Sequence, residues 1–269
     1  MIVVELRKLL LRPRTWLTIL LLDALPTLVA VLLAVTKIGP RPGEGPAFLS
    51  AVLADGQLFP AAALAIVLPL FLPVAVAVIS GDAIAGEAQA GTLRYLLVRP
   101  VGRTRLLVAK LVSVFAFVFL AVVIVAGTAY VVGVSLFGSA PVSAVTVSGS
   151  SLTPQQALLR TLLAMAYVAL SMLGVAALAL FVSTLTDAPL VATLGALALL
   201  IASTVLLALD AAGALHPYLP TRYWLSFVDL FRDPIRWRDI LRGVALQVVY
   251  VGALLTAAWA SFTTKDITS

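Results

Sequence analysis

The sequence predicts an all-α membrane protein with six transmembrane helices, and three observations support this fold class. First, 62% of the 269 residues are hydrophobic and only 11% are charged, whereas a soluble domain carries roughly 25% charged residues. Second, each of several charge-free runs is long enough to cross a hydrocarbon core ~30 Å thick as a helix. These runs are 56–81, 161–186, 188–209 and 243–264. Third, stretches rich in Gly, Pro and polar residues separate the runs.

The N-terminal half is expected to contain three spans. Residues 2–12 place charged side chains between apolar ones at helical spacing, which predicts an amphipathic helix at the membrane interface. Pro13 ends this helix, and the first span follows over 15–35, with Trp16 at the depth of the headgroups. A loop rich in Gly and Pro leads to the second span at 59–80. The third span is expected at 106–134.

The C-terminal half is expected to contain spans at 162–185, 188–209 and 244–262. Asp187 is a candidate N-cap of the fifth span, with Pro189 in its first turn. The segment 210–242 combines Pro, aromatic and charged residues, which favours interfacial anchors and short amphipathic helices at the outer leaflet. An outer gate or lateral entrance is the alternative for this segment. The whole chain, 1–269, is interpreted as one transmembrane domain.

Charge asymmetry predicts that both termini are cytoplasmic, because Lys and Arg gather on the cytoplasmic side of a membrane protein. Four basic residues precede the first span, five lie between the second and third spans, and the loop 138–159 has none. The segment 210–242 opposes this orientation, since it would be outside yet is also rich in arginine. Its aspartates nearly balance that charge. The net charge of +6 is therefore attributed to membrane orientation, and no nucleic-acid partner is expected.

Catalytic and cofactor motifs are missing from the sequence. There is no cysteine, which excludes disulfides and thiolate metal sites. No G-x-x-x-x-G-K-[ST], H-E-x-x-H or G-x-S-x-G motif occurs, and the single histidine, His216, has no acidic cluster near it in sequence. We therefore expect no metal site, no cofactor and no enzymatic activity in this chain.

The polar segment 81–105, after the second span, is the most informative part of the sequence. Asp82 and Glu87 are expected near the start of a helix, where acidic residues suit the positive end of the helix dipole, and Gly91 is expected to break or bend it. The segment and the start of the third span resemble the signature that follows the second span of ABC-2 type permeases. The resemblance rests on Gly86-Glu87, Gly91-Thr92-Leu93-Arg94, Leu96-Leu97, Arg99-Pro100, Arg103 and Lys110.

The resemblance extends weakly over the whole chain, including the segment 219–231 and Lys265-Asp266 near the C-terminus. It implies a permease subunit of an ATP-binding cassette transporter in the inner membrane, paired with a second permease subunit in a homo- or heterodimer. Two separate ATPase subunits would bind ATP and Mg²⁺ and dock on 81–105. Export of a hydrophobic or amphiphilic substrate is expected. The coupling residues implied are Asp82, Glu87, Gly91, Thr92, Leu93, Arg94, Arg99 and Arg103.

Four further residues are candidates for a substrate path or gate: Asp23, Gln247, Tyr223 and Trp224. An ionised Asp23 inside the first span would cost about 2.5 to 3.5 kcal/mol on insertion scales, so it should face protein or water. It either belongs to a substrate path or has a structural partner such as a hydroxyl group. Gln247 in the sixth span is equally suited to helix packing.

Two other classes of function are alternatives to the permease. An ion-coupled secondary transporter would usually carry several ionisable residues at mid-membrane and paired broken helices, and Asp23 alone fits that pattern. A lipid-modifying membrane enzyme would need a cluster of His, Asp, Glu or Ser at one membrane face, and the sequence offers no such cluster.

Overall fold

The computed structural model describes residues 1–36, 55–91, 102–138, 144–145 and 151–264. Six of its helices are long and apolar enough to cross a membrane, which confirms the expected all-α membrane fold. The elements in chain order are α1 (Ile2–Leu11), α2 (Pro13–Thr36), η1 (Gly56–Leu58), α4 (Phe59–Val67), α5 (Phe71–Gln89), α7 (Arg103–Phe137), β1 (Ala144–Val145), β2 (Ser151–Leu152), α8 (Pro154–Leu185), α9 (Pro189–Leu207), η2 (Asp210–Ala212), η3 (His216–Tyr218), η4 (Trp224–Phe231) and α10 (Trp237–Thr264).

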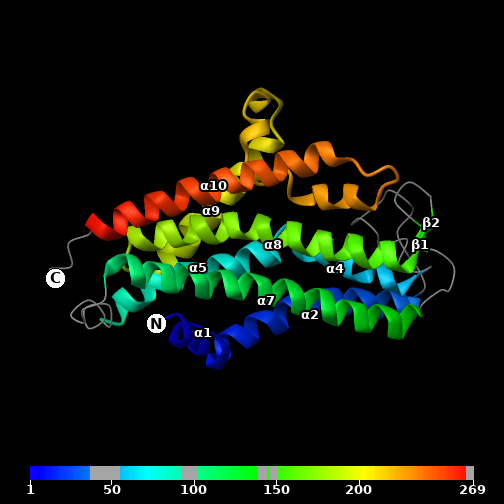
Figure 1. Cartoon of the computed structure of the whole chain (residues 1–269), viewed down its shortest axis with the longest axis horizontal. Coiled ribbons are helices and arrows are strands. Elements are labelled where there is room, and N and C mark those ends of the chain that lie inside the picture. The colour runs from blue at the N-terminus through cyan, green and yellow to red at the C-terminus, as the bar shows by residue number, and fades with distance from the viewer. Residues whose placement is uncertain (37–54, 92–101, 139–143, 146–150, 265–269) are drawn as a thin grey trace.

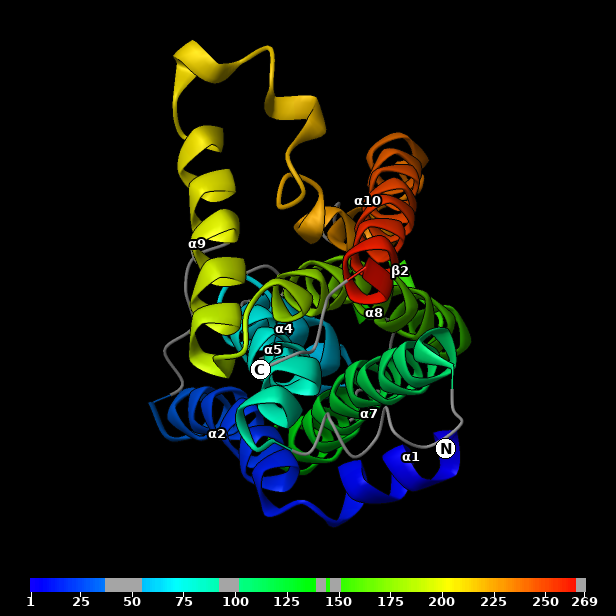
Figure 2. The same ribbon diagram turned by 90° about the vertical axis from the view of Figure 1, so that its left-hand side faces the viewer.

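The long helices α2, α7, α8 and α10 run along the long axis of the molecule (Figure 1). Helix α1 and the C-terminal end of α10 lie at one end of this bundle, and the short antiparallel pair β1–β2 lies at the other. Helix α9 leans away from the bundle, so that α9 and α10 stand apart above α8 (Figure 2). The chain from Asp210 to Phe231 runs between them.

The second span is broken, whereas the sequence predicted one continuous helix over 59–80. Helix α4 ends at Val67 and α5 starts at Phe71. Pro69 lies in the break, and a proline ring removes one backbone donor and clashes with the preceding turn of a helix. The part before the break is almost completely buried, while Leu70 and Phe71 at the break are exposed.

Helix α5 continues to Gln89, so it includes Asp82 and Glu87 in its C-terminal half. The expectation that these acids begin a new helix, at the favourable end of its dipole, is therefore wrong. Gly91 ends the helix in the left-handed conformation, with φ +67°, as the sequence predicted for a helix break. The acids instead lie near the negative end of α5, where they need cationic partners.

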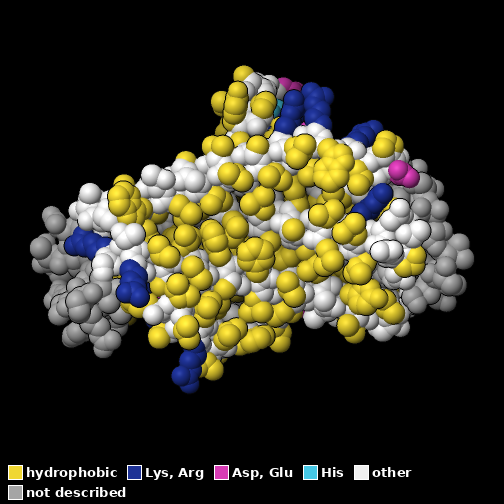
Figure 3. Space-filling model, viewed as in Figure 1, with side chains coloured by type: hydrophobic (Ala, Val, Ile, Leu, Met, Phe, Trp, Pro, Cys, Tyr) yellow, Lys and Arg dark blue, Asp and Glu magenta, His cyan; other side chains and the backbone are white. Residues whose placement is uncertain are grey.

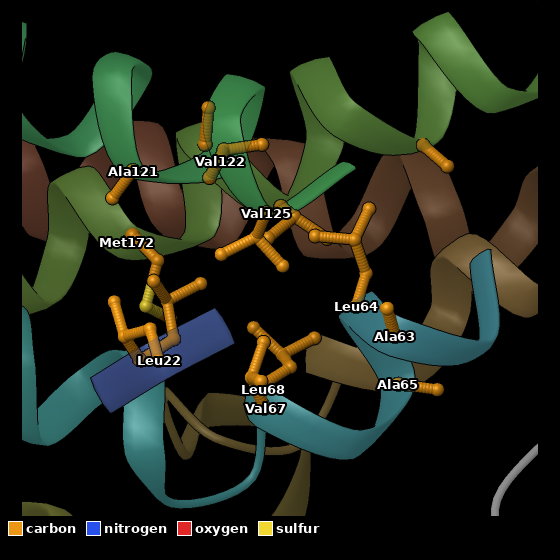
Figure 4. Close-up of a cluster of buried hydrophobic side chains, with 14 of the residues drawn as sticks. Leu22, Ala63, Leu64, Ala65, Val67, Leu68, Ala121, Val122, Val125 and Met172 are labelled. Carbon is orange, nitrogen blue, oxygen red and sulfur yellow. The ribbon is translucent and has the colours of Figure 1, made fainter. Parts of the chain in front are cut away.

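The hydrophobic core surrounds α4, which contributes Ala63, Leu64 and Val67 (Figure 4). Leu22 of α2, Val125 of α7 and Met172 of α8 belong to the same cluster. Small residues let the backbones approach closely. A Cβ atom added at Gly133 of α7 would clash with the backbone of Gly56 in η1.

The outer faces of the bundle are apolar, as expected for helices that contact lipid. Hydrophobic side chains cover most of the middle of the face in Figure 3, and Lys and Arg lie toward its margins. Helices α2 and α9 expose rows of large aliphatic side chains. These are Leu17, Leu20, Leu21, Leu28 and Leu32 on α2, and Leu190, Val191, Leu194, Leu199, Ile201 and Val205 on α9.

Some helix starts differ from the sequence predictions. Helix α8 starts at Pro154 rather than 162, because Thr153 and Gln156 form a capping box. Helix α10 starts at Trp237 rather than 244. Asp187 is not the N-cap of α9: Ala188 occupies that position, and its N–H donates to Thr186 Oγ1 at 3.2 Å.

Candidate functional site

A cluster of four charged side chains joins α1, α5 and α7. Lys110 of α7 donates to Glu87 Oε1 of α5 at 2.6 Å and to Glu5 Oε2 of α1 at 2.9 Å. Lys8 of α1 also pairs with Glu87. Glu5, Glu87 and Lys110 are all at most 9% exposed, and Lys8 closes the cluster toward the surface. We call these four residues the charge cluster; their formal charges sum to zero.

The helices place these side chains on facing surfaces. Glu5 and Leu9 are four residues apart and form the buried side of α1, and Lys8 lies one turn from Glu5. Glu87 lies in the last turn of α5, where an anion faces the negative end of the helix dipole. The ammonium groups of Lys8 and Lys110 offset that repulsion and the loss of hydration. The cluster therefore holds Glu87 ionised inside the protein.

A second, more exposed set of ions lies next to the charge cluster. Arg12 and Arg14 each approach Asp82 Oδ2 at 3.5 Å, and both guanidinium groups are largely exposed. These residues, with Glu5 and Lys110, line a small cavity between α1, α2, α5 and α7. At this distance and exposure the pairs contribute little stability. Together with Lys8, Arg12 and Arg14 bring three cationic side chains from the first 14 residues to the C-terminal half of α5.

Ser183 of α8 forms hydrogen bonds with the backbone of α5 about one turn before Glu87. Its hydroxyl donates to the carbonyl of Gly81 at 2.6 Å and accepts from the backbone N–H groups of Ile84 at 3.2 Å and Ala85 at 2.9 Å. Gly81 is also the point of closest approach to α9, because a Cβ there would lie 2.7 Å from Thr193 Oγ1. The C-terminal half of α5 therefore contacts α8 and α9 as well as α1 and α7.

Two hydrogen bonds join the start of α7 to the end of α10. Arg103 donates to the carbonyl of Thr263 at 2.8 Å, and Trp259 Nε1 donates to Thr104 Oγ1 at 3.0 Å. A cation at the last carbonyls of a helix is favourable. Among the predicted coupling residues, the structure therefore describes Asp82, Glu87, Gly91 and Arg103. Thr92, Leu93, Arg94 and Arg99 lie outside the described residues.

The four candidates for a substrate path or gate do not come together. Asp23 lies on α2 and accepts a hydrogen bond from Thr128 Oγ1 of α7 at 2.8 Å, which is the structural partner that the sequence left open. Gln247 of α10 lies next to the segment 210–231, to which Tyr223 and Trp224 belong. Gln247 Nε2 donates to the carbonyl of Pro220 at 2.8 Å, and the carbonyl of Tyr223 accepts from Tyr167 OH at 2.6 Å.

Sequence reasoning missed the partners of Glu87. Glu5 and Lys8 were interpreted as parts of an interfacial helix, and Lys110 as one of several basic residues. One signal could have pointed to Lys110: it lies inside the otherwise apolar stretch 106–134. A charged residue in such a stretch needs a partner of opposite sign.

Comparison with known proteins gives the family of the chain. No curated protein matches it significantly. A family model described as "Protein of unknown function (DUF2705)" matches residues 47–268, which include α4, the charge cluster residues Glu87 and Lys110, and all later helices. The chain therefore belongs to the DUF2705 family.

Proposed function

We propose that this chain is the membrane-spanning permease subunit of an ABC-2 type ATP-binding cassette transporter. Two separate ATPase subunits, which bind ATP and Mg²⁺, dock on the connection between α5 and α7. A second permease subunit completes the membrane part of the transporter. The cargo is a hydrophobic or amphiphilic molecule, and the direction is export.

The charge cluster is the observation that carries this proposal. The connection 90–102 joins two helices, α5 and α7, that are ion-paired to each other and to α1, and Glu5, Glu87 and Lys110 of these pairs are buried. Removing one member of a buried ion pair costs about 3 to 5 kcal/mol, so α1, α5 and α7 resist separation at this place. A partner that pushes on the connection would move the three helices as one body, which is how rigid-body gating transmits force.

The buried position of Glu87 changes the role that the resemblance gave it. A carboxylate that is 7% exposed and paired with two lysines has little surface for a partner protein. We assign it to transmission within the chain. Direct contact with the ATPase is assigned to the residues of 92–101, with Arg94 and Arg99 as the first candidates.

The distribution of charge supports a cytoplasmic location for this end of the bundle. Helix α1, the end of α5, the start of α7 and the end of α10 lie at this end of the bundle. Basic residues are concentrated there, which favours the cytoplasmic side of an inner membrane. They are Arg7, Lys8, Arg12, Arg14, Arg103, Arg105 and Lys110.

The exposed side chains of α1 support an interfacial position for that helix. Val3, Val4, Leu10 and Leu11 are exposed, whereas Glu5 is buried against the bundle. Exposed apolar residues on a helix whose Glu5 and Lys8 side chains pair with the bundle suit the boundary of headgroups and acyl chains. The exposed aliphatic rows of α2 and α9 are similarly suited to a second permease subunit or to lipid.

The proposal is tested by purifying the chain with candidate ABC ATPase subunits in nanodiscs and measuring assembly and ATP hydrolysis. The test variant is Arg94→Ala with Arg99→Ala. The control is Arg236→Ala with Arg238→Ala, which removes the same charge from two exposed residues of the outer segment. Loss of assembly in the first variant alone supports docking at 92–101. If the native chain binds none of the ATPases encoded beside it, the proposal is wrong.

An ion-coupled secondary transporter is the second candidate, and the break between α4 and α5 favours it. Discontinuous helices line the ion sites of many such transporters. Leu22, next to Asp23, belongs to the same core cluster as Leu68 at the break. Substrate flux that follows an imposed Na⁺ or proton gradient without ATP, and that Asp23→Asn abolishes, would favour this candidate over the permease.

A further inference from the structure

A cavity of ≈ 280 Å³ lies inside this single chain, between α8, α9 and α10 and beneath the segment 210–231. Val175 and Leu178 of α8 line it from below, and Leu200 and Leu206 line it from α9. Leu199 and Ala202 of α9 also line it and are themselves exposed, so the cavity opens to the surroundings along α9. Figure 2 shows the two helices that flank it, α9 and α10, standing apart above α8.

The lining contains no charged side chain. An ionised group placed there would lose its hydration without a counter-ion, which excludes phosphate, carboxylate and ammonium groups as occupants of the interior. An apolar cavity of about 150 Å³ is large enough to hold benzene, so this one has room for roughly ten non-hydrogen atoms. The occupant must therefore be apolar and elongated or bicyclic.

Polar side chains among the lining residues favour an occupant that carries a neutral oxygen. Trp224 lines the cavity and is only 6% exposed, and its indole N–H has no acceptor among the described residues. An unsatisfied buried donor is unfavourable, and a carbonyl or ether oxygen would relieve it. The neighbouring polar groups are already paired: Ser203 with Thr221 at 2.8 Å, and Gln247 Nε2 with the carbonyl of Pro220.

We propose that this cavity binds the ester end of one acyl chain of a membrane phospholipid, about ten non-hydrogen atoms of it. The ester carbonyl lies near Trp224, and the headgroup and the rest of the chain lie outside. The size, the absence of charge and the free indole donor all suit an acyl ester. The opening along α9 provides an entrance from the bilayer. The site lies within one chain and needs no ATPase, so its test is independent of the proposed transport function.

Trp224 itself can report the occupant. The other three tryptophans, Trp16, Trp237 and Trp259, are each about half exposed, and Phe can replace them in the full-length chain. The single-tryptophan protein is placed in nanodiscs with an increasing fraction of phospholipid that carries dibrominated chains. Bromine quenches indole fluorescence only at close range. Because Trp224 is buried, we expect quenching that saturates with the brominated fraction.

Two cavity-filling variants and one control decide the origin of the quenching. Ala202→Phe fills the cavity from α9, and Leu254→Phe fills it from α10. Ala198→Phe adds the same ring to an exposed position of α9 that does not line the cavity. We expect both filling variants to lose most of the quenching and the control to keep it, with unchanged helicity and elution volume in all three.

Three outcomes would overturn the proposal. One is quenching that rises in proportion to the brominated fraction and is the same in the two cavity-filling variants, because such quenching reports contact of Trp224 with bulk lipid. Another is no quenching at all. The third is a difference between two probes: a brominated fatty-acid methyl ester, added to nanodiscs without brominated lipid, quenches Trp224 saturably, whereas the brominated phospholipid does not quench it. The site would then bind a free neutral amphiphile and not a phospholipid.

Discussion

At the scale of single residues, Glu87 should matter more for stability than any other acid of the polar segment. Glu87→Gln removes the counter-ion of Lys8 and leaves Lys110 with Glu5 alone among the described ion pairs. We expect a loss of roughly 3 kcal/mol in the free energy of unfolding, at the low end for a buried pair because Lys8 is partly exposed. Denaturant titration in detergent, followed by circular dichroism, measures it.

Asp82→Asn is the matched control for that prediction. Its partners are exposed and 3.5 Å away, so it should cost less than about 1 kcal/mol. Equal losses for the two variants would show that burial does not distinguish the charge cluster from the surface ions.

Ser183 is the second residue with a defined prediction. Ser183→Ala removes one hydroxyl that serves a carbonyl and two N–H groups of α5. We expect a loss of about 1 to 2 kcal/mol and faster hydrogen exchange at Ile84 and Ala85, read by mass spectrometry. Ser113→Ala, whose hydroxyl makes only a 3.5 Å contact with the carbonyl of Glu5, should leave exchange in α5 unchanged. If hydrogen exchange at Ile84 and Ala85 is unchanged in both variants, the Ser183 hydroxyl does not stabilise α5.

At the scale of elements, the spans could be predicted because their signal is local. A charge-free run of sufficient length predicts a spanning helix wherever it packs, and such runs marked α8, α9 and α10. The end of α5 could not be predicted in this way. Asp82 and Glu87 indicated a water-exposed segment, but their partners are Arg12 and Lys8, which lie 70 and 79 positions away in sequence. Pairing at that distance depends on helix packing.

The candidate site was also predictable only in part: one of its residues could be selected from the sequence, but its partners could not. Resemblance selected Glu87, but its buried state follows from Glu5, Lys8 and Lys110, and no sequence motif links these residues. The break after Val67 is also a matter of context, since proline inside a span bends some helices and interrupts others. Pro26 lies inside α2 without interrupting it, whereas Pro69 lies in a gap between two helices.

The contact between α5 and α9 gives a prediction for a pair of elements. Gly81→Val should push the helices apart, because even a Cβ at this position meets Thr193 Oγ1 at 2.7 Å and Thr193 N at 3.1 Å. Overpacking of this kind costs about 1 to 3 kcal/mol. Gly127→Val on α7, where a Cβ meets nothing within 4 Å, is the control. A melting temperature lowered by both substitutions equally would contradict the close contact.

At the scale of the whole molecule, the two ends of the bundle should lie on opposite sides of the membrane. Every proposal about coupling requires that α1 and the connection between α5 and α7 share one side, and the charge distribution favours the cytoplasm as that side. The chain lacks cysteine, so single cysteines can be introduced on a clean background. Arg7→Cys and Gly102→Cys mark one end, and Gln155→Cys marks the other; all three positions are exposed.

Labelling of intact cells with a membrane-impermeant maleimide then decides the orientation. We expect Gln155→Cys to react from outside, and Arg7→Cys and Gly102→Cys to react only after the membrane is opened. The reverse pattern would place the charge cluster outside the cell, where no ATPase could dock, and would end the permease proposal. Labelling of Arg7→Cys and Gly102→Cys from opposite sides would contradict the fold itself, because the ion pairs of Glu87 require α1, α5 and α7 to meet at one end.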